Sequence, residues 1–155
     1  MTVEEGSMAP DARYLCPDGS EATIAAHRGR PLVLWFYPKD DTSGCTSEAK
    51  AFSERAADFR DAGVALLGIS RDPPKSHLAF IDKHALTVPL GTDEDGSVTE
   101  AFGVWVEKNM YGKRYMGIER ATFLIDAEGR VARAWRKVKV PGHAEAVLAA
   151  AQALG

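Results

Sequence analysis

The chain has 155 residues, of which 45% are hydrophobic and 26% charged, and its formal net charge is −3 at pH 7. This length suits one domain with a buried core and no need of disulfide or metal crosslinks. The acidic balance argues against a dedicated nucleic-acid binder, and the apolar runs are too short to span a membrane. We expect residues 1–11 to form a mobile tail, not a secretory signal, and residues 12–155 to form a single domain.

Strand and helix signals alternate in the first half of the chain. Residues 31–37 (PLVLWFY) form a continuous apolar run, which is typical of a buried parallel strand. After a polar loop, apolar side chains recur at helical spacing, at Cys45, Ala49, Phe52, Ala56 and Phe59. Residues 64–70 (VALLGIS) predict a second buried strand. The three elements therefore predict a βαβ unit with parallel strands.

The second half continues this alternation. Asp72 and the two prolines after it predict the start of a helix that ends near His84. A short strand, a short helix, a strand with a twisted loop, a β-hairpin and a final helix are then predicted at residues 88–90, 98–102, 104–117, 121–135 and 143–154. This order predicts an α/β fold of the thioredoxin-like type, with a mixed central sheet flanked by helices.

Residues 130–139 (RVARAWRKVK) carry five basic side chains around Trp135. Such a patch would suit an anionic partner, and it would equally suit solvated side chains on a sheet strand. We favour the strand, because the patch is short and the rest of the chain is acidic. The four histidines have no metal-site spacing with the cysteines, so we predict no metal, and surface or capping roles for His27, His77, His84 and His143.

The two cysteines, Cys16 and Cys45, form no CxxC motif and no zinc-ligand pattern. Cys45 falls in the predicted first turn of the helix that follows the central strand. Free N–H groups and the helix dipole favour a thiolate there. Asp40 and Asp41 oppose that charge, so a further cation is needed. Thr42, three residues before Cys45, can turn its hydroxyl towards the sulfur or cap the helix.

Pro38, Thr42 and Cys45 match the P-x-x-x-T-x-x-C signature of peroxiredoxins. The wider run FYPKDDTSGCTSEA, with GIERATFLID and WRKVKVPGHAEAVL, resembles the bacterioferritin-comigratory, or peroxiredoxin-Q, subfamily over residues 14–154. The resemblance implies a thiol peroxidase without a cofactor. In such an enzyme the Cys45 thiolate attacks the distal oxygen of hydrogen peroxide or a small organic hydroperoxide and becomes a sulfenic acid.

The resemblance also implies roles for the neighbours of this cysteine. Thr42 would bind the thiolate and the peroxide, and Pro38 would shield the sulfur from water. Arg120 would supply the missing cation, and Glu48 would hold that arginine in place. Spacing alone would make Arg120 a surface arginine and Glu48 a solvated helix acid. The backbone N–H group of Gly44 is a further expected peroxide contact.

The chain departs from the subfamily in its second cysteine. The usual resolving position, five residues after Cys45, holds Lys50, and the following helix has no cysteine. We favour Cys16 as a small core residue and expect a one-cysteine cycle, in which an external thioredoxin- or glutaredoxin-like thiol reduces the sulfenic acid. A two-cysteine cycle through Cys16 stays open.

A redox-sensing role also stays open, in which oxidised Cys45 forms mixed disulfides with partner proteins. A dithiol oxidoreductase is disfavoured, because it would require CxxC at the helix start, and this chain has Cys45-Thr46-Ser47-Glu48 there. The small number of thiols favours a cytoplasmic protein. The resemblance further implies a monomer.

Overall fold

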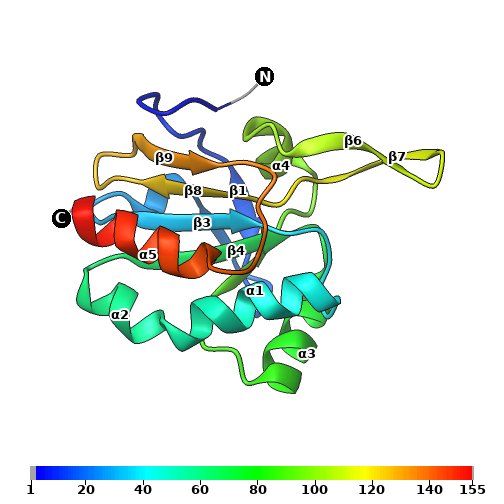
Figure 1. The fold of residues 1–155 in the computed structure, drawn as a ribbon, viewed down its shortest axis with the longest axis horizontal. Coiled ribbons are helices and arrows are strands. Elements are labelled where there is room, and N and C mark those ends of the chain that lie inside the picture. Colours follow the sequence, from blue (N-terminus) through cyan, green and yellow to red (C-terminus); the bar gives the residue numbers. More distant parts are fainter. Residues whose placement is uncertain (1–2, 155) are drawn as a thin grey trace.

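A computed structural model describes residues 3–154 and shows a mixed sheet with helices on both faces (Figure 1). Within that range the main sheet has seven strands, in the spatial order β2 (Glu21–Thr23), β1 (Arg13–Leu15), β5 (Leu90–Thr92), β4 (Ala65–Ser70), β3 (Leu32–Phe36), β8 (Ala121–Ile125) and β9 (Val131–Trp135). β3 runs parallel to β4 and antiparallel to β8. The α/β, thioredoxin-like class is thereby confirmed.

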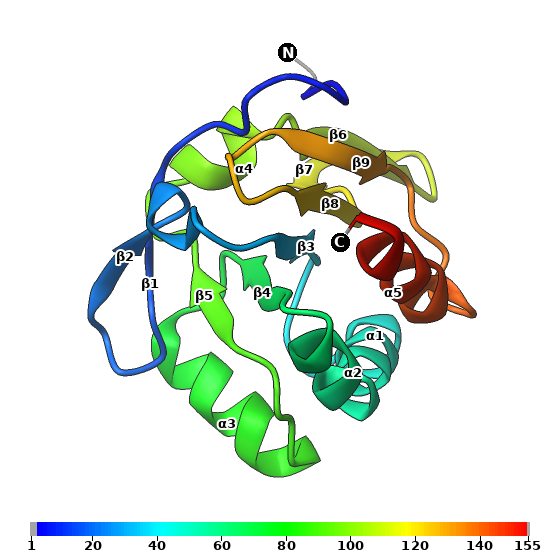
Figure 2. The same cartoon turned by 90° about the vertical axis from the view of Figure 1, so that its left-hand side faces the viewer.

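Helices cover both faces of the sheet (Figure 2). One face carries α1 (Ser43–Glu54), α2 (Ala56–Asp61), α3 (Pro74–His84) and α5 (His143–Leu154). The other carries α4 (Ser97–Ala101) and a short 3-10 helix, Ala25–His27. We expected one continuous helix through Phe59, but the chain leaves helical geometry at Arg55, with φ −105° and ψ 7°, so two helices share the apolar stripe.

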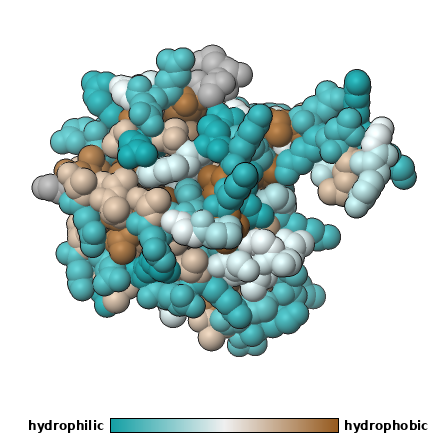
Figure 3. All heavy atoms as spheres, viewed as in Figure 1, coloured by the Kyte–Doolittle hydropathy of each residue, from teal (hydrophilic) through white to brown (hydrophobic). Residues whose placement is uncertain are grey.

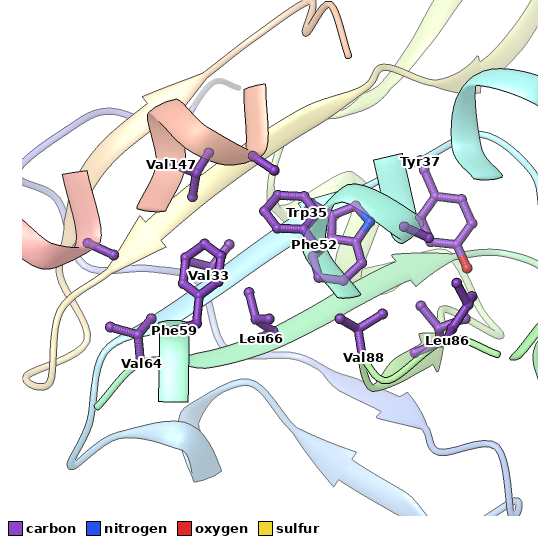
Figure 4. Close-up of a cluster of buried hydrophobic side chains, with 14 of the residues drawn as sticks. Val33, Trp35, Tyr37, Phe52, Phe59, Val64, Leu66, Leu86, Val88 and Val147 are labelled. Atoms are coloured by element: carbon purple, nitrogen blue, oxygen red, sulfur yellow. The ribbon is translucent and has the colours of Figure 1, made fainter. Parts of the chain in front are cut away.

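The central strand β3 shows how the sequence builds two cores at once. Successive strand residues point to opposite faces, and every residue of β3 is buried. Val33 and Trp35 therefore enter the core beneath α1 and α5 (Figure 4). Leu34 enters the opposite core. Trp35 stacks on Phe52 of α1 with ring centroids 4.5 Å apart. Burying each such aromatic side chain contributes about 2 kcal/mol.

Residues 104–117, predicted as a strand and a twisted loop, instead form most of a β-hairpin that stands away from the main sheet. Its strands are β6 (Trp105–Met110) and β7 (Lys113–Ile118), in antiparallel register. The turn residues Tyr111 and Gly112 both have positive φ, 53° and 80°. Such a pair suits the type I′ turn that fits the twist of two-residue hairpins. The hairpin projects to the right in Figure 1.

The first described residues lie along β9. Gly6 N donates to Val131 O at 2.7 Å, Val131 N to Ser7 O at 2.8 Å, and Ala9 N to Gly129 O at 2.8 Å. The mobility expected of residues 1–11 and the boundary at residue 12 stay predictions, which amide hydrogen exchange measures. Residues 1 and 2 lie outside the described part. Among residues 3–154 no helix is long and apolar enough to cross a bilayer.

The basic run 130–139 forms β9 over Val131–Trp135, which confirms the strand interpretation for that part. The Arg133 guanidinium lies 4.8 Å from the ring centroid of Trp135, so the aromatic ring is covered by a side chain of the same strand. The early hairpin of β1 and β2, which the family resemblance implies around Cys16, has no strand signal in the residue pattern. Both strands have three residues, too few for a clear alternation in sequence.

Candidate active site

Cys45 lies in the first turn of α1, directly beyond the carboxyl end of β3. The helix begins at Ser43, so the unpaired N–H groups of its first turn and the positive end of its dipole lie beside the cysteine. The Cys45 side chain is only 2% exposed and packs in the same cluster as Tyr37 and Ala49. The inward position expected from the apolar stripe is confirmed.

Arg120, between β7 and β8, reaches this cysteine from 75 residues along the chain. Its Nη2 donates to Cys45 Sγ at 3.3 Å, and its Nη1 donates to Glu48 Oε1 at 2.7 Å. Gly44 lies against the same guanidinium, since a Cβ there would stand 3.1 Å from Nη2. The structure therefore brings Cys45, Arg120, Glu48 and Gly44 together.

Glu48 is the least satisfied member of this cluster. It is 1% exposed, and its Oε2 has no hydrogen-bond partner within the described residues. Burial raises the pKa of Glu48 to about 7, although the neighbouring Arg120 opposes that shift. Two acidic groups, Cys45 and Glu48, thus share one guanidinium. A proton held on Glu48 near neutral pH leaves the charge of Arg120 available to the thiolate.

Thr42 occupies the N-cap position of α1, but its hydroxyl does not cap the helix. Its Oγ1 donates to Lys39 O at 2.8 Å, and across residues 3–154 it makes no side-chain bond to a first-turn N–H. The capping role is therefore wrong. Because the hydroxyl proton is directed to Lys39, the oxygen lone pairs remain able to accept a hydrogen bond from a ligand. Pro38 follows β3 as a half-buried residue, and its shielding role stays a prediction.

A second buried cluster was missed from the sequence. Asp40 was treated as a loop charge opposing the thiolate, yet its Oδ2 lies 2.7 Å from His77 Nδ1. His77 Nε2 faces Gly91 O at 2.9 Å. Both ring nitrogens of His77 therefore lie within hydrogen-bonding distance of an oxygen atom. Tyr37 OH donates to Asp40 Oδ1 at 2.6 Å and Ser76 Oγ to Oδ2 at 2.7 Å.

The pKa of Asp40 is shifted in the opposite direction from that of Glu48. Burial would raise the pKa of Asp40, but the hydrogen bond and charge of His77, with the Tyr37 and Ser76 bonds, hold it below its usual value. Asp72, which we expected to cap α3, instead accepts from Asp40 N at 2.9 Å. The cap of α3 is Pro73. The loop before Cys45 is thus tied to the strand and helix that follow it.

Asp41 adds a second attachment of this loop to α3. Its backbone has φ 58°, an unfavourable value for a residue with a side chain. Lys83 Nζ and His84 Nε2 each lie 2.7 Å from its carboxylate oxygens. Hydrogen bonds from His84 and Lys83 lower the pKa of Asp41. These contacts stabilise the turn that leads into the helix of Cys45.

The surface or capping roles expected of all four histidines are wrong for two of them. His77 is fully buried, and His143 is nearly so, with Nε2 2.8 Å from Thr122 Oγ1. Burial and, to a lesser extent, the charge of Arg120 together lower the pKa of His143 to about 4. His143 is therefore neutral above that pH. Over residues 3–154 no three His, Cys, Asp or Glu side chains form a group suited to a metal ion.

The two cysteines lie on opposite faces of the main sheet. Cys45 belongs to the core beneath α1 and α5, whereas Cys16, in the turn after β1, packs against the opposite core. The strand order β1-β5-β4-β3 also separates β1 from the strand that precedes Cys45 by three spacings, about 14 Å. Both thiols are free. Lys50, at the subfamily's resolving position, is exposed on α1.

A broad depression of about 760 Å³ lies at the other end of the strands. Its lining includes Arg28, Arg60 and Pro89, from segments that precede β3, β4 and β5. Cys45 lies at the carboxyl end of β3, the end where ligands of open α/β sheets bind. The chemistry of the residues, and not the size of the hollow, therefore identifies the candidate site.

Comparisons of the whole sequence with known families and proteins find clear relatives of this chain. The AhpC/TSA family profile matches residues 6–134. Peroxiredoxin Bcp of Xanthomonas campestris is 53% identical over 135 residues, covering 87% of this chain and 84% of that protein. Peroxiredoxin Bcp of Bacillus subtilis is 44% identical, covering 92% and 91%.

Solved structures of related proteins are similar in fold. Xanthomonas campestris bacterioferritin comigratory protein, studied for its alkyl peroxide reduction activity, superposes with a TM-score of 0.89 at 46% identity, covering 97% of this chain and 98% of that one. A Xylella fastidiosa PrxQ variant gives 0.92 at 38% identity, covering 99% and 98%. The chain therefore belongs to the AhpC/TSA family, as a thiol peroxidase of its Bcp, or peroxiredoxin Q, subfamily.

Proposed function

We propose that this chain reduces hydrogen peroxide and small organic hydroperoxides through a sulfenic acid on Cys45, in a one-cysteine cycle that an external thiol completes. The hydrogen bond of 3.3 Å from Arg120 Nη2 to Cys45 Sγ carries the proposal. It places a fixed cation on the sulfur that must act as an anion. The alkyl peroxide reduction activity of the Xanthomonas campestris relative supports the choice of substrate.

The proposed first step is a displacement at oxygen. The Cys45 thiolate attacks the terminal oxygen of the hydroperoxide, an S–O bond forms, and the O–O bond breaks. The leaving alkoxide or hydroxide takes up a proton and departs as alcohol or water. Arg120 and the Gly44 N–H stabilise the charge that develops on the oxygens, and Thr42 Oγ1 accepts a hydrogen bond from the O–H of the bound hydroperoxide, whose proton stays on the oxygen that becomes the sulfenic acid. Pro38 shields the product from water.

The one-cysteine cycle is supported by the position of Cys16. A disulfide needs two Cα atoms within about 7 Å, and these two cysteines lie on opposite faces of a sheet. An intramolecular bridge would require rearrangement of the packed core. An external thiol therefore completes the cycle in this proposal, acting on a monomer in the cytoplasm, where protein dithiols are kept reduced.

The test is an intact mass under non-reducing conditions, recorded seconds after one equivalent of hydrogen peroxide is added. We expect a gain of one oxygen that maps to Cys45 and disappears with dithiothreitol. The Cys45→Ser variant should show no fast gain. A loss of two hydrogens would instead show a bridge to Cys16, and a covalent dimer would show bridging between chains.

The rate at which peroxide oxidises Cys45 distinguishes a catalytic role from a redox-sensing role. A peroxidase must be oxidised far faster than a free thiol and must turn over repeatedly with a reductant. Slow oxidation followed by a stable mixed disulfide with another protein would favour the redox-sensing role. No reaction of Cys45 with either class of hydroperoxide would contradict the proposal altogether.

A further inference from the structure

The β6–β7 hairpin carries most of the large apolar side chains that this molecule exposes. Seven such side chains are exposed among residues 3–154, and four of them are on the hairpin, namely Met110, Tyr111, Tyr115 and Met116. Tyr111, at the tip, is 98% exposed and has a positive φ, which is unfavourable for an aromatic residue. Exposed apolar side chains gathered in one place mark interaction surfaces, and Met and Tyr are enriched in them.

The hairpin has two distinct faces, because directly opposite residues share a face and successive residues alternate. The pairs Lys108↔Tyr115 and Met110↔Lys113 form one face, called here the Lys108 face. The pairs Glu107↔Met116 and Asn109↔Arg114 form the other, the Met116 face. Figure 3 shows the hairpin standing clear of the body at the right.

The Lys108 face continues into the active site. Lys108 is close enough to Arg120 and Cys45 for their charges to act on its pKa, which burial and Arg120 lower and the cysteine raises. A Cβ on Gly117 would lie 3.3 Å from the Lys108 stem and 3.5 Å from the Tyr115 ring. The missing side chain at Gly117 therefore lets the side chains of Lys108 and Tyr115 fold over the base of the hairpin, at the end of β7 that leads to Arg120 in the chain.

The two faces differ in charge. On the Met116 face, Arg114 Nε lies 3.5 Å from Glu107 Oε1, so its charges cancel. The Lys108 face carries Lys108 and Lys113, and neither has a salt-bridge partner in the described part of the chain. The face that leads to Cys45 is thus apolar and cationic. It is complementary to an apolar surface edged with acidic side chains.

We propose that the Lys108 face, with Tyr111 at its tip, is the docking surface for the protein dithiol that reduces oxidised Cys45. This inference rests on the proposed one-cysteine function. Cys45 is buried, so a protein reductant must be aligned before its thiol reaches Sγ. The Lys108 face has the exposed apolar side chains and the lysines, unpaired within residues 3–154, to align one. The partner expected is a small protein whose reactive thiol lies on an apolar surface with acidic neighbours.

The reaction on this surface balances in two steps. The partner's thiolate attacks Cys45 Sγ, an S–S bond forms, the S–O bond breaks, and the leaving hydroxide takes up a proton as water. The partner's second thiol then attacks its own sulfur in the mixed disulfide, which releases the Cys45 thiolate. The partner supplies both electrons and leaves as an internal disulfide.

The experiment compares one methionine on each face. Met110→Ser alters the Lys108 face and Met116→Ser the other, and the two side chains have similar exposure, 55% and 50%. Peroxide turnover is measured with a thioredoxin, with a dithiol glutaredoxin and with dithiothreitol. The readout is the ratio of the protein-supported to the dithiothreitol-supported rate, which corrects for any general loss of activity.

We expect the ratio to fall about threefold in Met110→Ser and about tenfold in Met110→Ser/Tyr115→Ser, with at least one of the two proteins, and not in Met116→Ser. Added salt should lower the ratio further by screening the lysines. Equal ratios in the two single variants, or wild-type turnover with dithiothreitol but with neither protein, would overturn the docking proposal. So would a wild-type dimer that Met110→Ser/Tyr115→Ser dissociates.

Failure of the proposed function looks different, because it appears before any reductant is present. If peroxide alone adds no oxygen to Cys45 in the wild-type protein, the peroxidase proposal fails. If oxygen is added and only the face comparison fails, the peroxidase stands and the docking surface is elsewhere.

Discussion

Two buried charge clusters contact the segment from Tyr37 to Glu48, and they differ in how completely their polar atoms are paired. In the first, Asp40 receives hydrogen bonds from Tyr37 and Ser76 and pairs with His77, whose second nitrogen bonds to a carbonyl. In the second, Arg120 serves both Cys45 and Glu48, and Glu48 Oε2 has no partner in the described part of the chain.

The difference separates a structural cluster from a reactive one. Complete pairing stabilises the ionised carboxylate of Asp40 and fixes the loop. In the second cluster the guanidinium is available to a negative charge on the sulfur, and burial raises the pKa of Glu48 to about 7. Buried, underpaired ionisable groups are typical of catalytic sites. The fully paired cluster holds the reactive one in place.

The largest expected effect is the loss of the shared cation. Arg120→Ala should slow oxidation of Cys45 by hydrogen peroxide by about a thousandfold, or about 4 kcal/mol of activation free energy, because the thiolate and the peroxide oxygens lose their charge partner. Stopped-flow fluorescence measures this rate. Arg114→Ala, on the exposed hairpin, is the control and should react normally. A normal rate in Arg120→Ala would remove this residue from the site.

Substitution in the fully paired Asp40 cluster should lower the free energy of unfolding. Asp40→Ala leaves His77 buried without its carboxylate and should lower the free energy of unfolding by about 3 to 4 kcal/mol. Asp41→Ala removes an exposed pair one residue away and should cost less than about 1 kcal/mol. Urea unfolding measures both. Equal losses in the two variants would show that burial of the Asp40 cluster is not what stabilises the loop.

The pH dependence of stability should have opposite sign at the two clusters. The pKa of Glu48 rises from 4.5 to about 7 on folding, so the folded state binds more protons between these values and stability falls as pH rises through them. The resulting decrease in the free energy of unfolding is about 3 kcal/mol. Glu48→Gln should remove it. The pKa of Asp40 is lowered instead, so its contribution is present above pH 3.8 and lost below.

Unfolding of wild-type protein and Glu48→Gln at pH 4.5 and pH 7 measures this difference directly. The comparison cancels the contributions of His143 and Asp40, which both proteins share. The same loss of stability in Glu48→Gln would contradict the assignment of the raised pKa to Glu48.

The smallest expected effect is at Cys16. Cys16→Ser should change peroxide turnover with an external thiol by less than twofold and stability by about 0.5 kcal/mol, because the residue lies on the opposite face of the sheet from Cys45. A steady-state assay with dithiothreitol and with thioredoxin measures it. Lost turnover in this variant would establish Cys16 as a resolving cysteine.

The fold was predictable wherever burial imposed a pattern on neighbouring residues. Residues 31–37 are apolar throughout, and residues 64–70 are apolar except for Ser70, because both faces of β3 and β4 are covered. The parallel pair followed from these two runs. The hairpin was missed because its turn, Tyr111-Gly112, lacks the usual Asn-Gly signal and its strands are exposed. Hydrophobic periodicity predicts only strands with a buried face, and β6 and β7 are mostly exposed.

The site was predictable only in part, for a related reason. Cys45 could be placed from its helix position alone, but Arg120 meets it across 75 residues and was assigned through the family resemblance. Asp40 and His77 were missed because a charge in a polar loop reads as solvated. Their burial depends on how α3 packs against the loop, which no local pattern encodes.

The hydrogen bonds between residues 6–9 and the strand β9 have a consequence for handling the protein. β9 is the last strand of the main sheet, and Val131 bonds to Gly6 and Ser7 on its outer side. Removing the first ten residues would leave that backbone unpaired and free to add a strand from another molecule. A shortened chain should therefore aggregate more readily than the full chain, even with its active site unchanged.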